Sequence, residues 1–282
     1  MSASFDGAAS RALLADAALQ ETLRAIADGR ASDDAAGRAR LTAWGLVDAG
    51  GATRFGRSIA YNLMEYRTQI TRGAARDLVD LLRLTPDARV LDIACGAGQT
   101  LAAFAPAHPR LVVGLEIDPG AMAIFNAVCA QAGLPRCLGI RGDAQQLPFP
   151  AGSFDRVLCR GGLAFVRVPV ALTEIARVTA PGGLVYLHLS DGWFFLRKLL
   201  RGQLENGGAP LALLNGALLA ATGRQIVVGR SRTMNFQTVG GITRRLDRLG
   251  FDVLQVIRTP GNPLTTERLQ PKILARKRPT TG

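Results

Sequence analysis

The sequence reads Val90-Leu-Asp-Ile-Ala-Cys-Gly-Ala-Gly-Gln99 at the point that decides the fold. A short apolar run of this kind predicts a buried strand, and a loop with two glycines follows it. Glycine allows the backbone to approach a bound ligand at positions where a Cβ atom would clash. The stretch therefore predicts a strand, a ligand-binding loop and then a helix, with Asp92 placed just before the loop.

A second carboxylate follows at the expected distance. Glu116 lies 24 residues after Asp92 and ends the next apolar run, where it can accept hydrogen bonds from both hydroxyls of a ribose. A dinucleotide is disfavoured, because its fingerprint requires a third glycine where this chain has Leu101. Asp92 would also repel a pyrophosphate. The two acids therefore suit a nucleoside ligand that carries positive charge.

Apolar runs and helical stretches alternate from about Leu84 onward. This alternation predicts an α/β fold, with a Rossmann-like, mostly parallel sheet of seven strands and helices on both faces. The expected strands are residues 89–93, 111–117, 136–140, 154–159, 184–189, 251–257 and 272–276. The expected helices are residues 99–105, 120–132, 170–178, 193–201, 211–221 and 241–249.

Two regions depart from this alternation. Residues 1–70 are helical in pattern, with a small hairpin expected between Leu41 and Gly56, and they loosely resemble a winged-helix module. Because this segment carries no net charge, a packing or dimerisation cap is favoured over DNA binding. Residues 71–282 are expected to form the ligand-binding domain, with residues 191–238 as a lid inserted after the fifth strand.

Four segments in order resemble the class I S-adenosylmethionine-dependent methyltransferases. Residues 90–100 resemble the first motif of that family, and residues 112–118 resemble the second. Residues 142–159 resemble the segment that leads from the adenine site to strand four, and residues 174–185 the helix and turn before strand five. The resemblance implies a Rossmann-like methyltransferase of the small-molecule type, with S-adenosyl-L-methionine as its cofactor and S-adenosyl-L-homocysteine as product.

The resemblance also implies cofactor-binding residues. The loop would hold the methionine part of the cofactor through Asp92, Ala94, Cys95, Gly96 and Gly98. Its backbone groups near Ala94 and Gly96 would lie close to the ammonium group.

The remaining cofactor contacts are implied by the later motifs. Glu116 would bind the ribose, and Ile117 would pack on the adenine face. Asp143 would accept from the adenine amino group while the Ala144 amide donates to the ring; the alternative for Asp143 is a turn residue. Arg160 and Gly161 would lie beneath the sulfonium. These last two residues directly follow the fourth expected strand.

The acceptor site and the catalytic group are less well defined by the sequence. Tyr61, Tyr66, Trp193 and Phe194 are candidates to line the acceptor pocket, although ordinary packing is the alternative for the last two. Hydroxyl acceptors need a base, and His188 is the one candidate histidine. It lies inside an apolar run, so a structural role is favoured, and no catalytic residue is assigned.

The net charge of the chain is compatible with several functions. The net charge is +12, and residues 191–282 account for +10 of it. This excess either solvates a surface or attracts an anionic acceptor. It also motivates an RNA or protein methyltransferase as an alternative, and the winged-helix-like start motivates a regulator that binds the cofactor without turnover. Nucleic acid is disfavoured, because the N/D-P-P-Y/F motif of base-amine methyltransferases is absent.

Cysteine usage and the termini complete these expectations. The four cysteines show no C-x-x-C spacing and there are only two histidines, so we expect free thiols and no metal site. No apolar run reaches membrane-spanning length, and Met1 to Asp6 lack the pattern of a secretory signal. A cytoplasmic location is therefore expected, and a homodimer is compatible with the cap.

Overall fold

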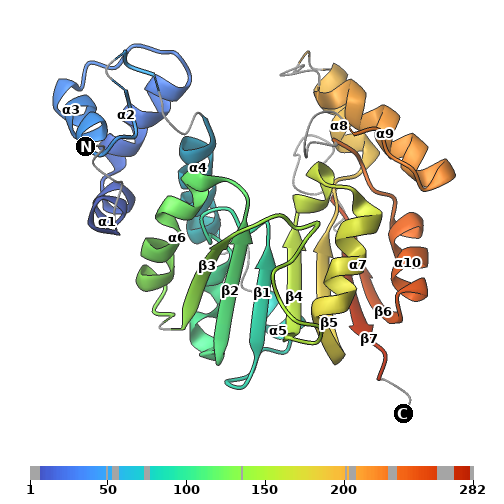
Figure 1. Cartoon of the computed structure of the whole chain (residues 1–282). Coiled ribbons are helices and arrows are strands. Elements are labelled where there is room, and N and C mark those ends of the chain that lie inside the picture. Colours follow the sequence, from blue (N-terminus) through green and yellow to red (C-terminus); the bar gives the residue numbers. More distant parts are fainter. Residues whose placement is uncertain are drawn as a thin grey trace. The chain divides into compact units, whose positions relative to one another are not determined.

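The computed structural model describes residues 7–48, 50–52, 57–72, 77–134, 136–200, 202, 208–227, 234–258 and 270–279. Its centre is one seven-stranded sheet in the order β3-β2-β1-β4-β5-β7-β6 (Figure 1). The strands are β1 (Arg89–Ile93), β2 (Leu111–Glu116), β3 (Cys137–Arg141), β4 (Phe154–Arg160), β5 (Thr179–His188), β6 (Phe251–Ile257) and β7 (Lys272–Lys277).

Strand directions confirm a mostly parallel α/β sheet. β1 pairs in parallel with β4, β2 with β3, and β4 with β5. β7 is antiparallel to both of its neighbours, β5 and β6. The central strands are apolar along nearly their whole length, as expected for strands that are buried on both faces.

The helices are coloured in chain order in Figure 1. They are α1 (Gly7–Ala15), α2 (Ala17–Ala27), α3 (Ala35–Ala43), α4 (Arg57–Arg72), α5 (Asp77–Leu81), α6 (Pro119–Gln131), α7 (Val168–Val178), α8 (Gly192–Leu200), α9 (Gly208–Thr222) and α10 (Val239–Arg248). Two 3-10 helices, η1 (Leu101–Ala107) and η2 (Gly162–Phe165), follow β1 and β4.

The chain divides into two compact units. The first comprises residues 1–87 and 95–141, and the second comprises residues 88–94 and 142–282. In the first unit, leucines of α1 to α3 pack with α4 and with Ile124 of α6. Asp16 and Asp34 start α2 and α3, because their side chains accept hydrogen bonds from the backbone amides of Leu19 and Gly37.

The ring of Phe125 packs against β2 and β3 in the first unit. Phe125 of α6 is fully buried, and three glycines surround it. A Cβ atom would lie 3.1 Å from this ring at Gly98, 2.2 Å at Gly114 and 2.6 Å at Gly139. These glycines therefore make room for Phe125, so the second glycine of the motif has a packing role within the protein.

In the second unit a polar brace holds the segment before β4. The Glu174 carboxylate accepts from the Leu147 amide at 2.8 Å and pairs with Arg177 at 2.7 Å. Arg177 also donates to the carbonyls of Leu147 and Phe149. These hydrogen bonds lower the pKa of Glu174, Arg177 being the largest cause. The brace gives Glu174 and Arg177 a structural role within the segment that resembles the family motif.

The structure corrects three local predictions. The helix expected at residues 99–105 is the 3-10 helix η1, which contains Pro106. The expected turn at Pro181 to Gly183 lies inside β5, which already begins at Thr179. Cys129 and Cys137 form a disulfide, so free thiols are confirmed only for Cys95 and Cys159. The spacing argument missed this pair because a helix end and a strand start bring the two cysteines together.

Other expected elements are present or lie partly outside the described residues. Gly133, with φ +69°, follows the end of α6, as a stop residue should. After α3, Asp48 holds a turn by accepting from the amides of Gly50 and Ala52. Residues 53–56 of the expected hairpin lie outside the described residues, and so do residues 260–263, whose sequence Pro-Gly-Asn-Pro is typical of a turn.

Candidate functional site

The glycine loop of the first unit is fixed by Glu116. Gly96 and Gly98 have φ values of +58° and +82°, the left-handed region that favours glycine. The Gly96 amide donates to Oε2 of Glu116 at 3.0 Å. The other oxygen, Oε1, accepts from the amides of Ile117 at 2.8 Å and Asp118 at 2.9 Å. Glu116 thus contacts the loop, and its role toward a ligand stays a prediction.

Asn62 is a site residue that sequence reasoning missed. Its Oδ1 accepts from the Ala97 amide at 3.3 Å and from Nε2 of Gln99 at 3.2 Å. A Cβ atom at Gly96 would lie 2.5 Å from the same oxygen. α4 therefore supports the loop from a part of the chain about 35 residues upstream, and no local pattern marks Asn62 for this task.

Cys95 and Ile117 flank these polar contacts. Cys95 is a buried free thiol whose Sγ lies 3.5 Å from the Gly96 carbonyl. Ile117 is half exposed, which leaves its side chain available to a flat ligand surface.

In the second unit, the end of β1 packs tightly on the loop after β4. Asp92 is 1% exposed, and Ala94 has a φ of +55°, which is unusual for a residue with a side chain. A Cβ atom at Gly162 would lie 2.5 Å from the Ala94 Cβ and 3.0 Å from the Cys159 Sγ. Gly162 is therefore required by packing, and Gly161, with φ +75°, starts η2.

Asp143 belongs to a tight turn. Its Oδ1 accepts from the Gln145 amide at 2.8 Å, and Asp143 forms an isolated β-bridge with Gln146. The side chain of Gln145 in turn accepts from the Arg167 amide at 3.2 Å. Ala144 lies within this turn, half buried. The turn function that we considered as the alternative for Asp143 is thus present.

His188 ends β5 and is partly buried. It pairs in register with Arg160, the last residue of β4, and with Lys272 of β7. Burial, followed by the positive charges of Arg160 and Lys272, lowers the pKa of His188 to about 3, although a hydrogen bond with Gln270 opposes the shift. A neutral, weakly basic imidazole of this kind fits the structural role favoured by the sequence.

The four aromatic candidates have different surroundings. Tyr66 donates to the Gln131 side chain at 2.5 Å and is buried, which raises its pKa. Tyr61, on the same helix, is exposed. On α8, Trp193 is 47% exposed, whereas Phe194 packs edge to face on Phe195.

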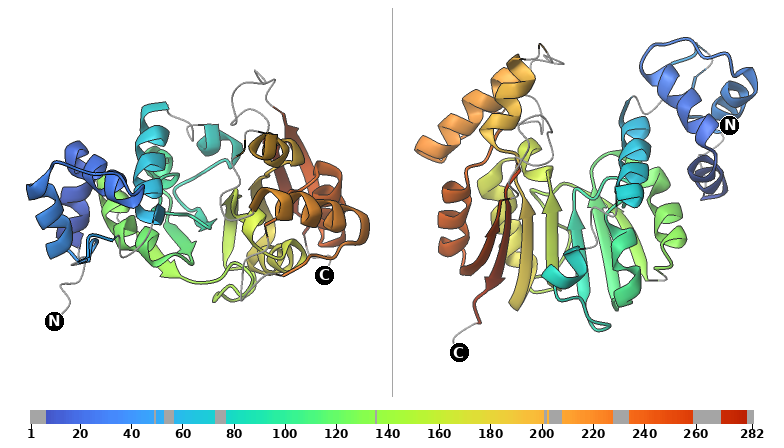
Figure 2. Two further views of the ribbon diagram at one scale, coloured as in Figure 1. Left: turned by 90° about the horizontal axis from the view of Figure 1, so that it is seen from above. Right: turned by 180° about the vertical axis from the view of Figure 1, so that it is seen from behind.

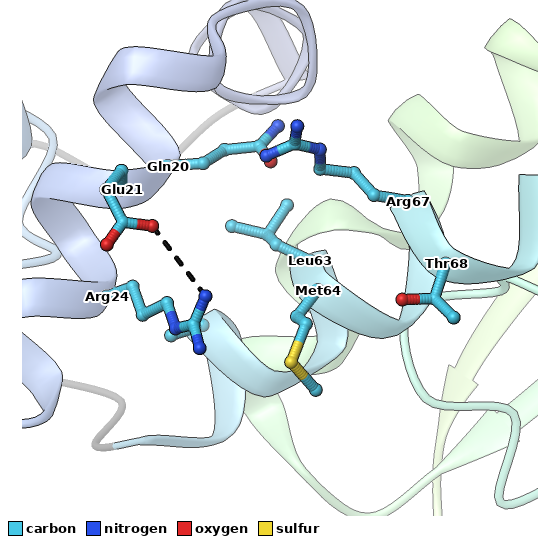
Figure 3. Close-up of a pocket in the computed structure, with 8 residues that line it drawn as sticks. Gln20, Glu21, Arg24, Leu63, Met64, Arg67 and Thr68 are labelled. Atoms are coloured by element: carbon cyan, nitrogen blue, oxygen red, sulfur yellow. Dashed lines mark ion pairs between the residues drawn. The ribbon is translucent and has the colours of Figure 1, made fainter. Parts of the chain in front are cut away.

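A cavity of about 300 Å³ lies between α2 and α4, and Figure 3 shows the residues that line it. Its apolar wall includes Leu63 and Met64, and Arg24 and Arg67 reach it from the two helices. Arg24 is paired with Glu21 at 3.7 Å. This cavity uses a face of α4 different from that of Asn62, so one helix both supports the glycine loop and lines a pocket.

Metal ligands do not cluster in the part of the chain that the structure describes: no group of three or more His, Cys, Asp or Glu side chains could hold an ion there. In the same residues, no helix is long and apolar enough to cross a membrane.

Comparisons with known proteins agree with this architecture. Residues 90–183 match the family described as "Methyltransferase domain". The chain is 31% identical over 163 residues to the fatty-acid O-methyltransferase of Mycolicibacterium smegmatis, covering 57% of this chain and 52% of that protein. It is 34% identical over 186 residues to the nocamycin O-methyltransferase of Saccharothrix syringae, covering 64% and 65%. The chain therefore spans about half to two thirds of these relatives.

A solved structure gives the same fold. The S-adenosylmethionine-dependent methyltransferase of Methanosarcina mazei has a TM-score of 0.52 and 22% identity, covering 72% of this chain and 97% of that chain. The sheet order and the glycine loop define a Rossmann-like α/β protein. Residues 90–183 resemble a methyltransferase domain, and the sheet has the fold of the solved S-adenosylmethionine-dependent methyltransferase.

Proposed function

We propose that the chain transfers the methyl group of S-adenosyl-L-methionine to a small-molecule acceptor. The observation that carries this proposal is the loop at Gly96, whose amide is held by Glu116 at 3.0 Å. A carboxylate fixed at a glycine loop after the first strand suits a nucleoside with vicinal hydroxyls. The buried Asp92 at the end of β1 adds negative charge that suits an ammonium or a sulfonium.

The cofactor contacts follow from these positions. We assign the ribose to Glu116, the adenine face to Ile117, and the adenine edge to Asp143 and Ala144. The methionine part is assigned to the loop from Asp92 to Gly98, and the sulfonium to the start of the β4 loop at Arg160 and Gly161. Glu116 and Asp143 already accept backbone hydrogen bonds, so a ligand would add to these bonds or exchange with them.

The bound cofactor supplies an activated methyl group, and the chain must then align an acceptor and exclude water. His188 is a poor base, because its neutral form is strongly favoured. The Asp191 side chain accepts from the Phe194 amide at 2.9 Å and so starts α8, and burial raises the pKa of Asp191. We assign both residues to holding the end of β5 and the start of α8, and we assign no general base.

A small acceptor is supported by the names of the relatives, which include enzymes for a fatty acid and for nocamycin. A further relative, from Renibacterium salmoninarum, is named for demethylmenaquinone. RNA is disfavoured by the neutral N-terminal segment and by the missing base-amine motif. Trp193 and Phe194 of α8, with Tyr61 of α4, remain candidates for acceptor contacts.

The test separates binding from turnover. Calorimetry with S-adenosyl-L-homocysteine measures cofactor binding, for which we expect a micromolar dissociation constant. Transfer of a labelled methyl group is then followed into three pools: small lipophilic acids and quinols, total RNA, and total protein. Label in the first pool supports the proposal. Label only in RNA or protein contradicts the acceptor class, and binding without label in any pool indicates a regulator.

A further inference from the structure

The exposed face of α9 carries no charge. This helix contains neither Asp, Glu, Lys nor Arg over its 15 residues. Its exposed positions include Pro210, Leu214, Ala217 and Ala221. They recur at spacings of four, three and four, so they form a single stripe along one side of the helix. Helices on the surface of soluble proteins normally present polar residues on that side.

Neighbouring segments extend this apolar stripe. Asn215 is fully buried and accepts from the Ile226 amide at 2.6 Å, and its Nδ2 donates to the Ile226 carbonyl at 3.0 Å. This pair of bonds fixes the Ile226 backbone beside Asn215, the residue after Leu214, and Ile226 and Val227 are both exposed. Leu214 itself is 57% exposed. We call these exposed apolar side chains of α9 and of the following segment the apolar ridge.

α8 packs alongside α9, and Figure 2 shows the two helices next to each other in both views. It adds Trp193 at one end and Leu200, which is 73% exposed, at the other. We call the exposed apolar residues of these two helices and of the following segment the α8–α9 face. Its members are Trp193, Leu200, Pro210, Leu214, Ala217, Ala221, Ile226 and Val227.

Cations outnumber acids in the sequence around this face. Residues 192–246 contain eight arginines and lysines and a single acid, Glu205. Among these cations, Arg224 is exposed next to the ridge, and Lys198 lies over the Phe194 ring on α8. Arg245 of α10 reaches the end of α9, donating to the Leu219 carbonyl at 3.5 Å. Arg201, Arg230, Arg232 and Glu205 lie outside the described residues.

We propose that the α8–α9 face binds the surface of an anionic lipid bilayer. Apolar side chains would enter the boundary between head groups and acyl chains, while the surrounding cations pair with lipid phosphates. α9 would lie in the plane of the surface, since 15 residues span only about 22 Å and cannot cross a bilayer.

The same charges argue against two other occupants. A second copy that docked through the same face would bring two acid-poor, cationic surfaces together, which is repulsive. A nucleic acid needs cations together with hydrogen-bonding or stacking groups, and the α8–α9 face between the cations is aliphatic apart from Trp193. An anionic bilayer matches both the aliphatic ridge and its positive border.

Binding is measured by sedimentation of the full chain with vesicles. We expect co-sedimentation with vesicles of phosphatidylglycerol and phosphatidylcholine, loss of binding to phosphatidylcholine alone, and weakening at high salt. Leu214→Glu should lower the partition coefficient about tenfold, because a charge replaces a side chain that enters the bilayer. Leu138→Glu is the matched control: it is similarly exposed, at 54%, but lies on β3, and should bind as the wild type does.

Trp193 provides a second readout on the face itself. In a Trp44→Phe background it is the single tryptophan, so its emission should shift to shorter wavelength with phosphatidylglycerol vesicles only. Unchanged emission, or equal sedimentation of Leu214→Glu and the wild type, would refute the proposal. Salt-sensitive binding of RNA that Leu214→Glu abolishes would also overturn it. Calorimetry of Leu214→Glu with S-adenosyl-L-homocysteine should match the wild type, which separates this test from that of the proposed function.

Discussion

The Gly96 amide donates to Oε2 of Glu116 at 3.0 Å, so the residue that ends β2 holds the loop that follows β1. These two residues lie 20 positions apart in the chain. Glu116 also accepts from the two amides that follow it, which fixes the orientation of its carboxylate. Loop and carboxylate are thus arranged before any ligand binds, which lowers the entropy cost of binding.

Replacing this carboxylate should weaken cofactor binding. Glu116→Ala removes the acceptor of the Gly96 amide and the proposed ribose contact, so we expect a loss of about 1–3 kcal/mol in the affinity for S-adenosyl-L-homocysteine. Calorimetry provides the measurement. The control Glu21→Ala removes an exposed carboxylate that pairs with Arg24 and Arg30 of the first unit, and it should bind normally. Equal affinities of the wild type, Glu116→Ala and Glu21→Ala would show that Glu116 does not contribute to cofactor binding.

Gly98 should be intolerant of a side chain for two separable reasons. Its φ of +82° strains any other residue, and a Cβ atom would lie 3.1 Å from the Phe125 ring. Gly133→Ala isolates the first effect, because its φ is +69° and nothing lies within 4 Å of a Cβ atom there. We expect Gly133→Ala to cost about 1 kcal/mol of unfolding free energy, and Gly98→Ala to cost more.

Urea unfolding of both variants measures the difference. Phe125→Leu in the Gly98→Ala background should recover part of the added loss by relieving the contact with the ring. If Gly98→Ala costs no more than Gly133→Ala, packing against Phe125 is not what selects glycine at position 98.

Much of this fold could be predicted because its signals are local. Strands such as residues 89–93 and 251–257 are short, mostly apolar runs, and their predicted limits match the structure. The glycine loop and Glu116 were predictable because their spacing follows from one strand, one helix and the next strand. The spacing within the motif is therefore enough to predict the loop and the position of Glu116 beside it.

The remaining site residues depend on tertiary contacts that no local pattern records. Asn62 supports the loop from a helix whose sequence resembles any amphipathic helix. Gly162 is required because it packs on Ala94 and Cys159, which only the fold brings together. The disulfide between Cys129 and Cys137 has the same origin. Such residues become visible when neighbouring elements are known.

Arg197 should reduce the stability of the protein. It is 8% exposed, and its Nη1 is buried without a hydrogen-bond acceptor in the described part of the chain. A buried donor left unsatisfied costs about 1–3 kcal/mol. Arg197→Met keeps the aliphatic volume and removes that donor, so we expect its unfolding free energy to exceed that of the wild type.

Arg224→Met is the matched control, because Arg224 is exposed. Urea unfolding should show a change within about 0.5 kcal/mol for this control. A clear loss of stability in Arg197→Met would mean that the guanidinium is satisfied in solution.

His188 should make the protein less stable in acid. Its pKa is lowered from 6.5 to about 3 in the folded state, by burial first and then by the charges of Arg160 and Lys272. Between these two values the unfolded chain binds the proton and the folded chain does not, so unfolding takes up a proton. The contribution of His188 to stability is therefore complete above about pH 6.5 and falls by up to about 1.4 kcal/mol for each pH unit below it.

His188→Gln keeps a hydrogen-bonding side chain without a titrating ring. Urea unfolding of both proteins between pH 7 and pH 5 should show the free-energy difference, wild type minus variant, decreasing as the pH falls. Parallel curves over this range would mean that the imidazole can be protonated in the folded protein, and that His188 is less buried than the structure indicates.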